Sequence, residues 1–175
     1  MAFRKIAPEQ LPGNVIDEIR NKWMLLSAGT MENFNFMTIN WGMIGELWYQ
    51  DAVTVYVRDS RYTLDYMNKN SKFAVISLKP GHQDALNIAG CQSGRDIDKV
   101  AKTGLTPVEL DGVPTFEEAA YTLVCETMYA GRLEPADIKQ ADIRDKAFPE
   151  YPIDPNAVDK QVMFVGRIVG AYINE

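Results

Sequence analysis

The feature that most constrains the fold is a series of short apolar runs, rich in β-branched and aromatic residues, separated by turn residues and short helix-like segments. The clearest run covers residues 52–58, and the longest covers residues 119–133. No regular alternation of strand and helix of the βαβ kind connects these runs, so a parallel sheet is not expected. The pattern predicts a mainly β, antiparallel barrel with peripheral helices.

Local signals place the individual elements. Strands are predicted at residues 23–28, 34–41, 52–58, 72–78, 105–110, 119–133 and 162–173. Helices are predicted at residues 14–22, 83–89, 96–102 and 137–146, and between Ser60 and Asn70. Residues 44–51 indicate an irregular connection, residues 111–114 indicate turns, Gly90 and Gly104 indicate helix ends, and Gly166 and Gly170 are candidate β-bulges.

Length and charge narrow the class of protein. A chain of 175 residues with 46% hydrophobic content can bury one substantial core, so one domain over residues 1–175 is expected. Cys91 and Cys125 lack C-x-x-C spacing and are interpreted as reduced thiols. No signal-peptide pattern or membrane-length apolar run is present, which favours a cytoplasmic protein with no membrane partner. A net charge of -6 argues against nucleic acid as a partner, so local cations must hold any anionic ligand.

Most catalytic constellations are missing from the sequence. His82 is the only histidine, which excludes a zinc site with several histidines and makes a catalytic triad a poor interpretation. Neither G-x-G-x-x-G nor G-x-x-x-x-G-K-[ST] occurs. The acidic pairs Glu117–Glu118 and Asp96/Asp98 fit turns or helix starts. If the protein is an enzyme, a cofactor carries the chemistry.

Two segments are candidates for anion binding. Arg58, Arg61 and Thr63 stand where a predicted strand passes into a predicted helix, and a phosphate monoester would fit there. Ser93, Gly94 and Lys99 surround a second predicted helix start. For each segment alone, a capped helix with solvated charges is an equally good interpretation.

Taken together, the motifs resemble one family. Their order along the chain is similar to that of the flavin reductase-like, FMN-binding split-barrel family, with flavoredoxin-like proteins as the branch it resembles most. The resemblance rests on residues 23–29, 35–42, 55–63, 93–99, 104–107 and 112–114. It covers most of the chain, and the ordered set is more specific than any single motif.

The resemblance implies an antiparallel, Greek-key-like split barrel that binds FMN, with NAD(P)H as electron donor and a small molecule or a protein as acceptor. It also implies a homodimer with FMN near the interface. No catalytic side chain is implied, since the flavin carries the chemistry. The implied cofactor-binding residues are Asn35, Phe36, Met37, Thr38, Asn40, Trp41, Arg58, Arg61, Tyr62, Thr63, Ser93, Gly94 and Lys99.

Phe36 departs from the family pattern, because members often carry a small hydroxyl residue there. Phe36 either removes one hydrogen bond to the cofactor, at about 1 kcal/mol, or points to the other face of its strand. An alternative interpretation as core aromatics applies to Trp41, Trp48, Tyr56 and Tyr62, and it is preferred for Trp48.

Other functions stay open at this point. The protein could be a flavoprotein electron carrier that does not use nicotinamides, a binding module for flavin or for haem with His82 as ligand, or an acidic structural partner. The Pro-bearing segment 147–160 contains Phe148, Tyr151 and Ile153, which would be buried by a second subunit or by the barrel itself.

Overall fold

The computed structural model describes residues 2–175. Its strands are β1 (Phe3–Ile6), β2 (Met24–Thr30), β3 (Asn33–Ile39), β4 (Gly42–Leu47), β5 (Gln50–Arg58), β6 (Lys72–Leu78), β7 (Pro107–Leu110), β8 (Val113–Phe116), β9 (Ala119–Leu133) and β10 (Gln161–Asn174). Its α-helices are α1 (Val15–Asp17), α2 (Thr63–Lys69), α3 (Gln83–Cys91), α4 (Lys99–Thr103) and α5 (Ala141–Ala147). Irregular helical turns occur at Pro8–Gln10, Glu18–Lys22 and Pro135–Asp137.

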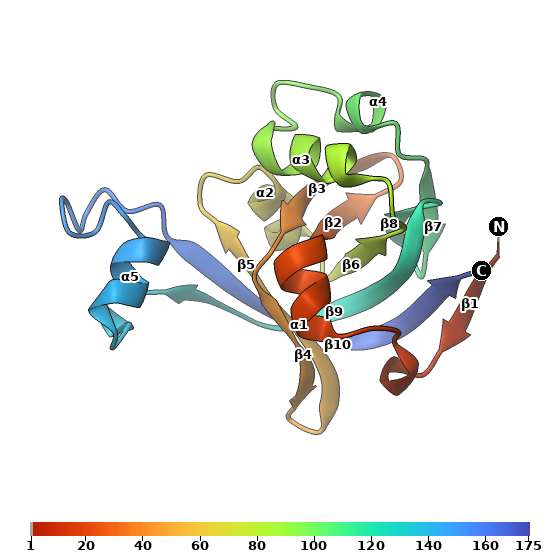
Figure 1. Ribbon diagram of the computed structural model, residues 1–175, viewed down its shortest axis with the longest axis horizontal. Coiled ribbons are helices and arrows are strands. Elements are labelled where there is room, and N and C mark those ends of the chain that lie inside the picture. The colour runs from red at the N-terminus through yellow and green to blue at the C-terminus, as the bar shows by residue number, and fades with distance from the viewer. Residues whose placement is uncertain (1) are drawn as a thin grey trace.

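The main sheet is antiparallel throughout, in the order β3-β2-β6-β9-β10-β5-β4. β1 pairs with the C-terminal part of β10, so both ends of the chain lie on one strand pair (Figure 1). β3 and β4 form the two edges of this order, yet only residues 40 and 41 separate them in the chain. The sheet must therefore curl back on itself, which confirms the predicted antiparallel barrel, split between β3 and β4.

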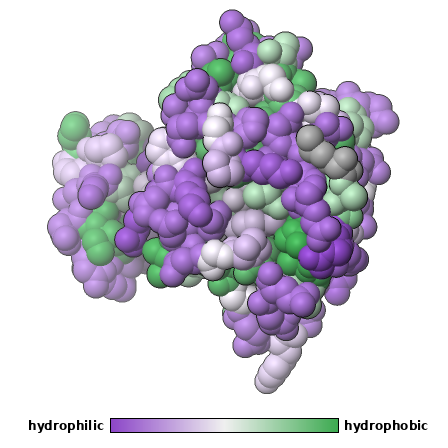
Figure 2. Space-filling model, turned by 45° about the vertical axis from the view of Figure 1, so that its right-hand side comes forward, coloured by the Kyte–Doolittle hydropathy of each residue, from purple (hydrophilic) through white to green (hydrophobic). Residues whose placement is uncertain are grey.

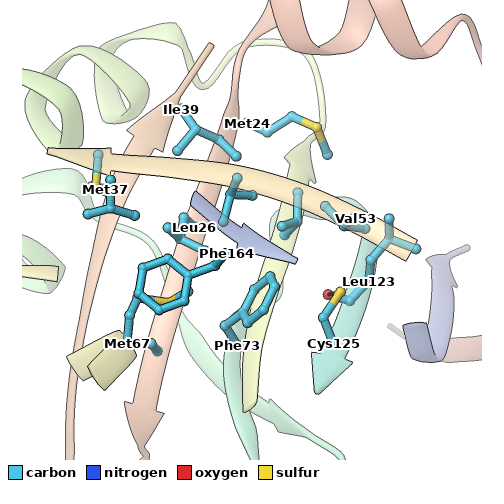
Figure 3. Close-up of a cluster of buried hydrophobic side chains, with 14 of the residues drawn as sticks. Met24, Leu26, Met37, Ile39, Val53, Met67, Phe73, Leu123, Cys125 and Phe164 are labelled. Atoms are coloured by element: carbon cyan, nitrogen blue, oxygen red, sulfur yellow. Dashed lines mark hydrogen bonds between the residues drawn. The ribbon is translucent and has the colours of Figure 1, made fainter. Parts of the chain in front are cut away.

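The barrel interior is filled by side chains from six of its strands and from α2. Figure 3 shows Leu26, Met37, Phe73 and Phe164 meeting there, and Met67 of α2 closes one side. A second apolar cluster lies on the outer face of the sheet under α3, α4 and the β7–β8 hairpin. Consecutive residues of β2 serve the two clusters in turn, because strand side chains alternate between faces.

The predicted irregular connection at residues 44–51 is wrong. These residues form the β4–β5 hairpin, with Leu47 opposite Gln50 and a two-residue turn at Trp48 and Tyr49. Both turn residues have positive φ, 55° and 61°, as a type I′ turn requires. Asn-Gly or Asp-Gly usually supplies that conformation, so two aromatic residues gave no turn signal.

Other boundaries also differ from the prediction. β1 was not predicted, and β8 begins where a Val113–Pro114 turn was expected, although the turn at Asp111 and Gly112 is present. α3 continues past Gly90 to Cys91, α4 begins at Lys99, and α5 begins at Ala141. The register of β10 shifts at Gly166 and Gly170, so both predicted bulges are confirmed.

The segment between β9 and β10 leaves the barrel as an arm that carries α5 (Figure 1). Phe148 is buried within this same chain, and its ring lies 5.7 Å from the Arg58 guanidinium. Ile153, five residues further on, is 87% exposed. The base of the arm thus packs on its own barrel, whereas its tip does not.

The face of the molecule seen in Figure 2 is mainly hydrophilic, with small separate apolar areas. Within residues 2–175, the helices are too short or too polar to span a lipid bilayer. Cys91 is exposed and Cys125 is buried, and neither forms a disulfide.

Candidate functional site

Three adjoining pockets form a groove on the side of the barrel where α2 meets β3 and β5. The inner pocket, of about 280 Å³, reaches from Asn35 to the loop around Gly94. The middle pocket, of about 110 Å³, shares Met37, Arg58 and Arg61 with the inner one. The outer pocket, of about 670 Å³, shares Asn40, Trp41 and Tyr56 with the middle one. Each pocket therefore adjoins the next, and the three together form the groove.

Three cationic side chains converge on the inner pocket, and main-chain carbonyl groups hold each of them in place. Arg61 donates to the Gly90 carbonyl at 2.6 Å. Lys99 donates from Nζ to the carbonyls of Phe36, at 2.7 Å, and Ala89, at 2.9 Å. Carbonyl groups orient a cation without neutralising it, so the inner pocket favours an anionic ligand.

Arg58 stands between the inner and middle pockets and is fixed by the arm. Its guanidinium donates to the carbonyls of Ala147, at 2.8 Å, and Asp159, at 3.1 Å. The Asp159 carboxylate lies 4.0 Å away, and the ring of Trp41 is 5.9 Å from the guanidinium carbon. A guanidinium has five N–H donors, so Arg58 keeps donors for a ligand after these contacts.

Lys99 is almost fully buried although it carries a charge. Burial, and secondly the nearby Arg61 charge, lower its pKa to about 8. Both effects disfavour the protonated form. An anion bound beside Lys99 would act in the opposite direction and raise this pKa again.

The loop that carries Ser93 and Gly94 approaches β3 very closely. A Cβ atom added to Gly94 would lie 2.3 Å from Oδ1 of Asn35 and 3.4 Å from the Tyr62 ring. Asn35 is itself buried and donates to the Thr63 hydroxyl at 2.9 Å. Only glycine at position 94 permits this approach, which sets the width of the inner pocket.

Arg95 lies beside the inner pocket without being one of its lining residues. Its guanidinium carbon is 4.4 Å from the centre of the Tyr62 ring and its Nη2 is 3.2 Å from a carboxylate oxygen of Asp65. The pair of Arg95 and Asp65 therefore holds Tyr62 against the loop.

Every residue predicted for the site lines this groove except Phe36. The inner pocket contains Asn35, Met37, Arg58, Arg61, Tyr62, Thr63, Ser93, Gly94 and Lys99, and the middle pocket adds Thr38, Asn40 and Trp41. The two candidate anion-binding segments, more than 30 residues apart, thus meet in one pocket. α2 is only seven residues long, so its N-terminus contributes little positive charge. The positive charge of the inner pocket therefore comes from the side-chain cations.

Phe36 does not reach the groove. Its side chain is 1% exposed and packs edge-on against Phe116, with ring centres 4.8 Å apart, in the cluster on the outer face of the sheet. Of the two predicted alternatives for Phe36, the structure has the one in which the ring points to the other face of the strand. Phe36 still contributes its carbonyl group, which accepts from Lys99.

Several groove residues were not among the predicted site residues, and Tyr56, Ser60 and Gln161 are three polar examples. Tyr56 had an alternative interpretation as a core aromatic, Ser60 was named as a candidate helix cap, and Gln161 was not singled out. The sequence contains a signal for Tyr56, because it precedes Arg58 by two residues in the same strand and residues two apart share a face. Gln161 has no local signal, since it enters the groove only through the pairing of β10 with β5.

His82 and the acidic residues do not form a second site of the kinds considered. His82 is partly exposed and precedes the first residue of α3. Within the part of the chain that the structure describes, no three potential metal ligands gather.

Comparisons with known proteins agree with this architecture. Residues 17–175 match the family model described as flavin reductase like domain. A flavin reductase-like FMN-binding domain from Shewanella baltica OS155 superposes with a TM-score of 0.67 at 15% identity, over 99% of this chain and 78% of that one. A flavoredoxin from Methanosarcina acetivorans gives 0.65 at 22% identity, over 88% and 69%.

A further structure is similar over almost the whole of this chain. An FMN-binding protein from Thermus thermophilus with bound 1-cyclohex-2-enone gives a TM-score of 0.64 at 20% identity, over 99% of this chain and 80% of that one. The comparison with curated proteins gave no significant match.

Proposed function

The chain belongs to the flavin reductase-like domain family, and on that premise we propose that it binds FMN in the groove and acts as an NAD(P)H-dependent oxidoreductase of the flavin reductase type. The observation that carries the proposal is the convergence of Arg58, Arg61 and Lys99 on the inner pocket. The neighbours that bind FMN, from Shewanella baltica and Thermus thermophilus, support the choice of flavin nucleotide among phosphorylated ligands.

The residues present fit this cofactor on two counts. The inner pocket has the cations and the Thr63 hydroxyl group that a phosphate monoester needs. The middle pocket contains a buried side-chain nitrogen, Nε2 of Gln161, without a hydrogen-bond partner, and leads into an open, mainly apolar pocket. A planar ligand with an anionic tail matches a groove that is charged at one end and apolar at the other.

In this proposal the side chains bind and orient the cofactor. Arg58 and Arg61 would hold the phosphate, and Lys99 would neutralise a further part of its charge. Trp41 and Tyr56 would border the flavin on the way to the outer pocket, and Asn40 offers an amide there. FMN supplies two-electron redox chemistry when bound, so no side chain need act as acid or base.

The outer pocket would receive the second reactant. It is lined by Ile16, Ile19 and Met43 and by the Arg20 side chain. An apolar wall with one cation suits the nicotinamide end of a reduced dinucleotide, which is planar and linked to phosphate. The same opening would serve an electron acceptor after the donor leaves.

The test is an absorption spectrum of the purified protein after addition of FMN and desalting, followed by anaerobic titration with NADH and NADPH. Retained FMN that is bleached by either nucleotide supports the proposal. A protein that cannot retain FMN contradicts the cofactor assignment. Retained FMN that neither nucleotide bleaches contradicts the enzymatic part only.

A flavoredoxin-like electron carrier is the second candidate function. The similarity to the Methanosarcina acetivorans flavoredoxin, at 22% identity, favours it. Such a carrier would take electrons from a protein and ignore nicotinamides, so the same anaerobic titration separates the two. Bleaching only by a reduced electron-transfer protein would support this alternative.

We also propose that the protein is a homodimer with FMN near the interface. Trp48 and Tyr49 at the tip of the β4–β5 hairpin and Ile153 in the arm are all largely exposed, so each offers apolar surface that a second subunit would bury. Light scattering over a range of protein concentrations tests this, and a concentration-independent monomer would contradict it.

A cytoplasmic location is part of the proposal. The two thiols are free, as expected for a protein that stays in a reducing compartment. Fractionation of cells, with activity or flavin content measured in each fraction, would test the location.

A further inference from the structure

Gln161 is the first residue of β10, and it lies directly opposite Arg58 of β5 in the antiparallel ladder. Side chains directly opposite each other in such a pair share one face of the sheet. Gln161 and Arg58 therefore stand side by side, on the face opposite to the one where Val57 and Val162 fill the barrel interior. Both line the middle pocket.

The Gln161 side chain is buried and incompletely hydrogen-bonded. The residue is 4% exposed, and its Nε2 has no hydrogen-bond partner among residues 2–175. Buried side-chain donors nearly always have a partner, because removing one from water without replacing its hydrogen bond is unfavourable. A buried donor beside a pocket is therefore a candidate for contact with a ligand.

Arg58 and Arg61 beside Gln161 offer it no acceptor, because guanidinium groups carry only donors. The acceptor oxygens of Thr38, Asn40 and Tyr56 line the same pocket, but none of them makes a hydrogen bond to Nε2. The middle pocket thus presents several N–H groups toward one small space. It is complementary to a ligand that brings acceptor oxygens.

We propose that Gln161 is a ligand-binding residue whose side-chain amide donates a hydrogen bond to an oxygen of the bound flavin other than those of its phosphate. This inference rests on the proposed function. We place the contact outside the phosphate because Lys99 and the loop at Ser93 and Gly94 line only the inner pocket, which does not include Gln161. Gln161 thereby recognises the part of the ligand that FMN and riboflavin share.

The test replaces Gln161 by a side chain of similar length that cannot donate. In Gln161→Met, we expect the affinities for FMN and riboflavin to fall by the same factor, about tenfold, as for the loss of one hydrogen bond. The melting temperature of the ligand-free variant should be equal to or higher than that of the wild type, because an unpaired buried donor has been removed. A residue with a purely structural role would instead lower the melting temperature.

Thr127→Val is the matched control. The Thr127 hydroxyl is also buried without a partner, but Thr127 pairs with Gly166 of β10, away from the groove. We expect this variant to keep the wild-type affinities for both ligands. A matching loss of affinity in the control would overturn the inference, since burial alone would then explain the effect.

Gln161→Glu is a second variant for the case in which Gln161→Met does not fold. Glutamate keeps the shape of glutamine, and its carboxylate would lie beside Arg58. It removes the donor at neutral pH, so riboflavin affinity should fall as well. Unchanged riboflavin affinity in either folded variant would overturn the inference while leaving FMN binding by the wild type intact. Failure of the wild type to bind any flavin would instead contradict the proposed function, and this inference with it.

Discussion

The inner and outer pockets of the groove differ in charge, size and the way their walls are held. The inner pocket, of about 280 Å³, has three cations fixed by main-chain carbonyls. The outer pocket, of about 670 Å³, has mainly apolar walls, and Arg20 is the cation among its described lining residues. Ile16, Trp41 and Met43 on these outer walls are largely exposed.

This contrast shows how one groove can bind two ligands in different ways. A charged pocket whose side chains are already fixed needs little rearrangement when it binds an anion, so it suits a cofactor that stays bound. An open, mainly apolar pocket with one cation among its described lining residues suits a reactant that enters and leaves at every turnover. Changes at the inner end should therefore alter cofactor affinity, and changes at the outer end should alter the kinetics of the second reactant.

The largest effect is expected from removing both arginines of the inner pocket. In Arg58→Ala/Arg61→Ala, FMN affinity should fall by roughly 100-fold or more, because charge-assisted hydrogen bonds to the phosphate are lost. Riboflavin affinity should change much less. Fluorescence titration of both flavins measures the two effects, with Arg4→Ala, an exposed arginine paired with Glu175, as control. Equal losses for FMN and riboflavin would contradict a phosphate contact.

The next effect concerns the width of the inner pocket. In Gly94→Ala, the new methyl group would meet Asn35 at 2.3 Å, so the loop must move away from β3. We expect FMN affinity to fall by about tenfold, as typical for a strained small-to-large change. Gly45→Ala in β4 is the matched control, because a Cβ there has open space around it. If Gly94→Ala bound FMN as tightly as Gly45→Ala does, the close approach of the loop to β3 would have no effect on FMN binding.

A smaller effect is expected from pH. The pKa of Lys99 is lowered to about 8 in the free protein, and a bound phosphate would raise it. Above pH 8 the free protein has lost the Lys99 proton that the complex retains, so binding requires proton uptake and affinity must fall as pH rises. Between pH 7 and 9 we expect a decrease of several-fold, to roughly tenfold.

The pH effect has a clear control. Lys102→Met, which changes an exposed lysine one turn from Lys99, should keep the wild-type pH profile. Lys99→Met should bind FMN more weakly but with an affinity that no longer depends on pH in this range. An affinity of the wild type that is constant from pH 7 to 9 would contradict the coupling of Lys99 to the bound anion.

The smallest effect is expected at the outer pocket. In Arg20→Ala, the KM for the reduced nicotinamide should rise by about threefold, since an exposed ion pair contributes little. FMN affinity should stay at the wild-type value. Steady-state kinetics at saturating FMN gives the KM, and a loss of FMN affinity in this variant would remove the distinction between the two ends.

The same contrast explains what could be predicted from the sequence. Arg58, Arg61, Thr63, Ser93 and Gly94 were identified because they sit at the ends of strands or helices, where local signals are strong. The strands that form the barrel were also identified by local alternation, as for β5, β6 and β9. The polar inner pocket is thus largely visible in the sequence.

What could not be predicted depends on pairing between distant segments or on unusual local conformations. Gln161 meets Arg58 only through the register of β10 with β5, which no local pattern specifies. The arm that fixes Arg58 through Ala147 and Asp159 is equally remote in sequence. The β4–β5 hairpin was missed because Trp48 and Tyr49 adopt positive φ without a glycine.

Phe36 shows that a binding residue cannot be assigned from its position in a family motif alone. It belongs to the right strand, but the alternation of β3 directs its side chain to the outer cluster and leaves only its carbonyl group to help, by holding Lys99. Thr38 shares this face of β3 and lines the middle pocket, so both the face and the position along the strand decide which residues reach the groove.

The most direct test of the account compares FMN and riboflavin on the wild-type protein. The two ligands differ only in the phosphate, so the ratio of their affinities measures what the inner pocket contributes to binding. Titration at pH 7, followed by flavin fluorescence, should give FMN an affinity at least about 100-fold higher, as expected for several charge-assisted hydrogen bonds. Equal affinities would contradict the central claim that Arg58, Arg61 and Lys99 form a phosphate site.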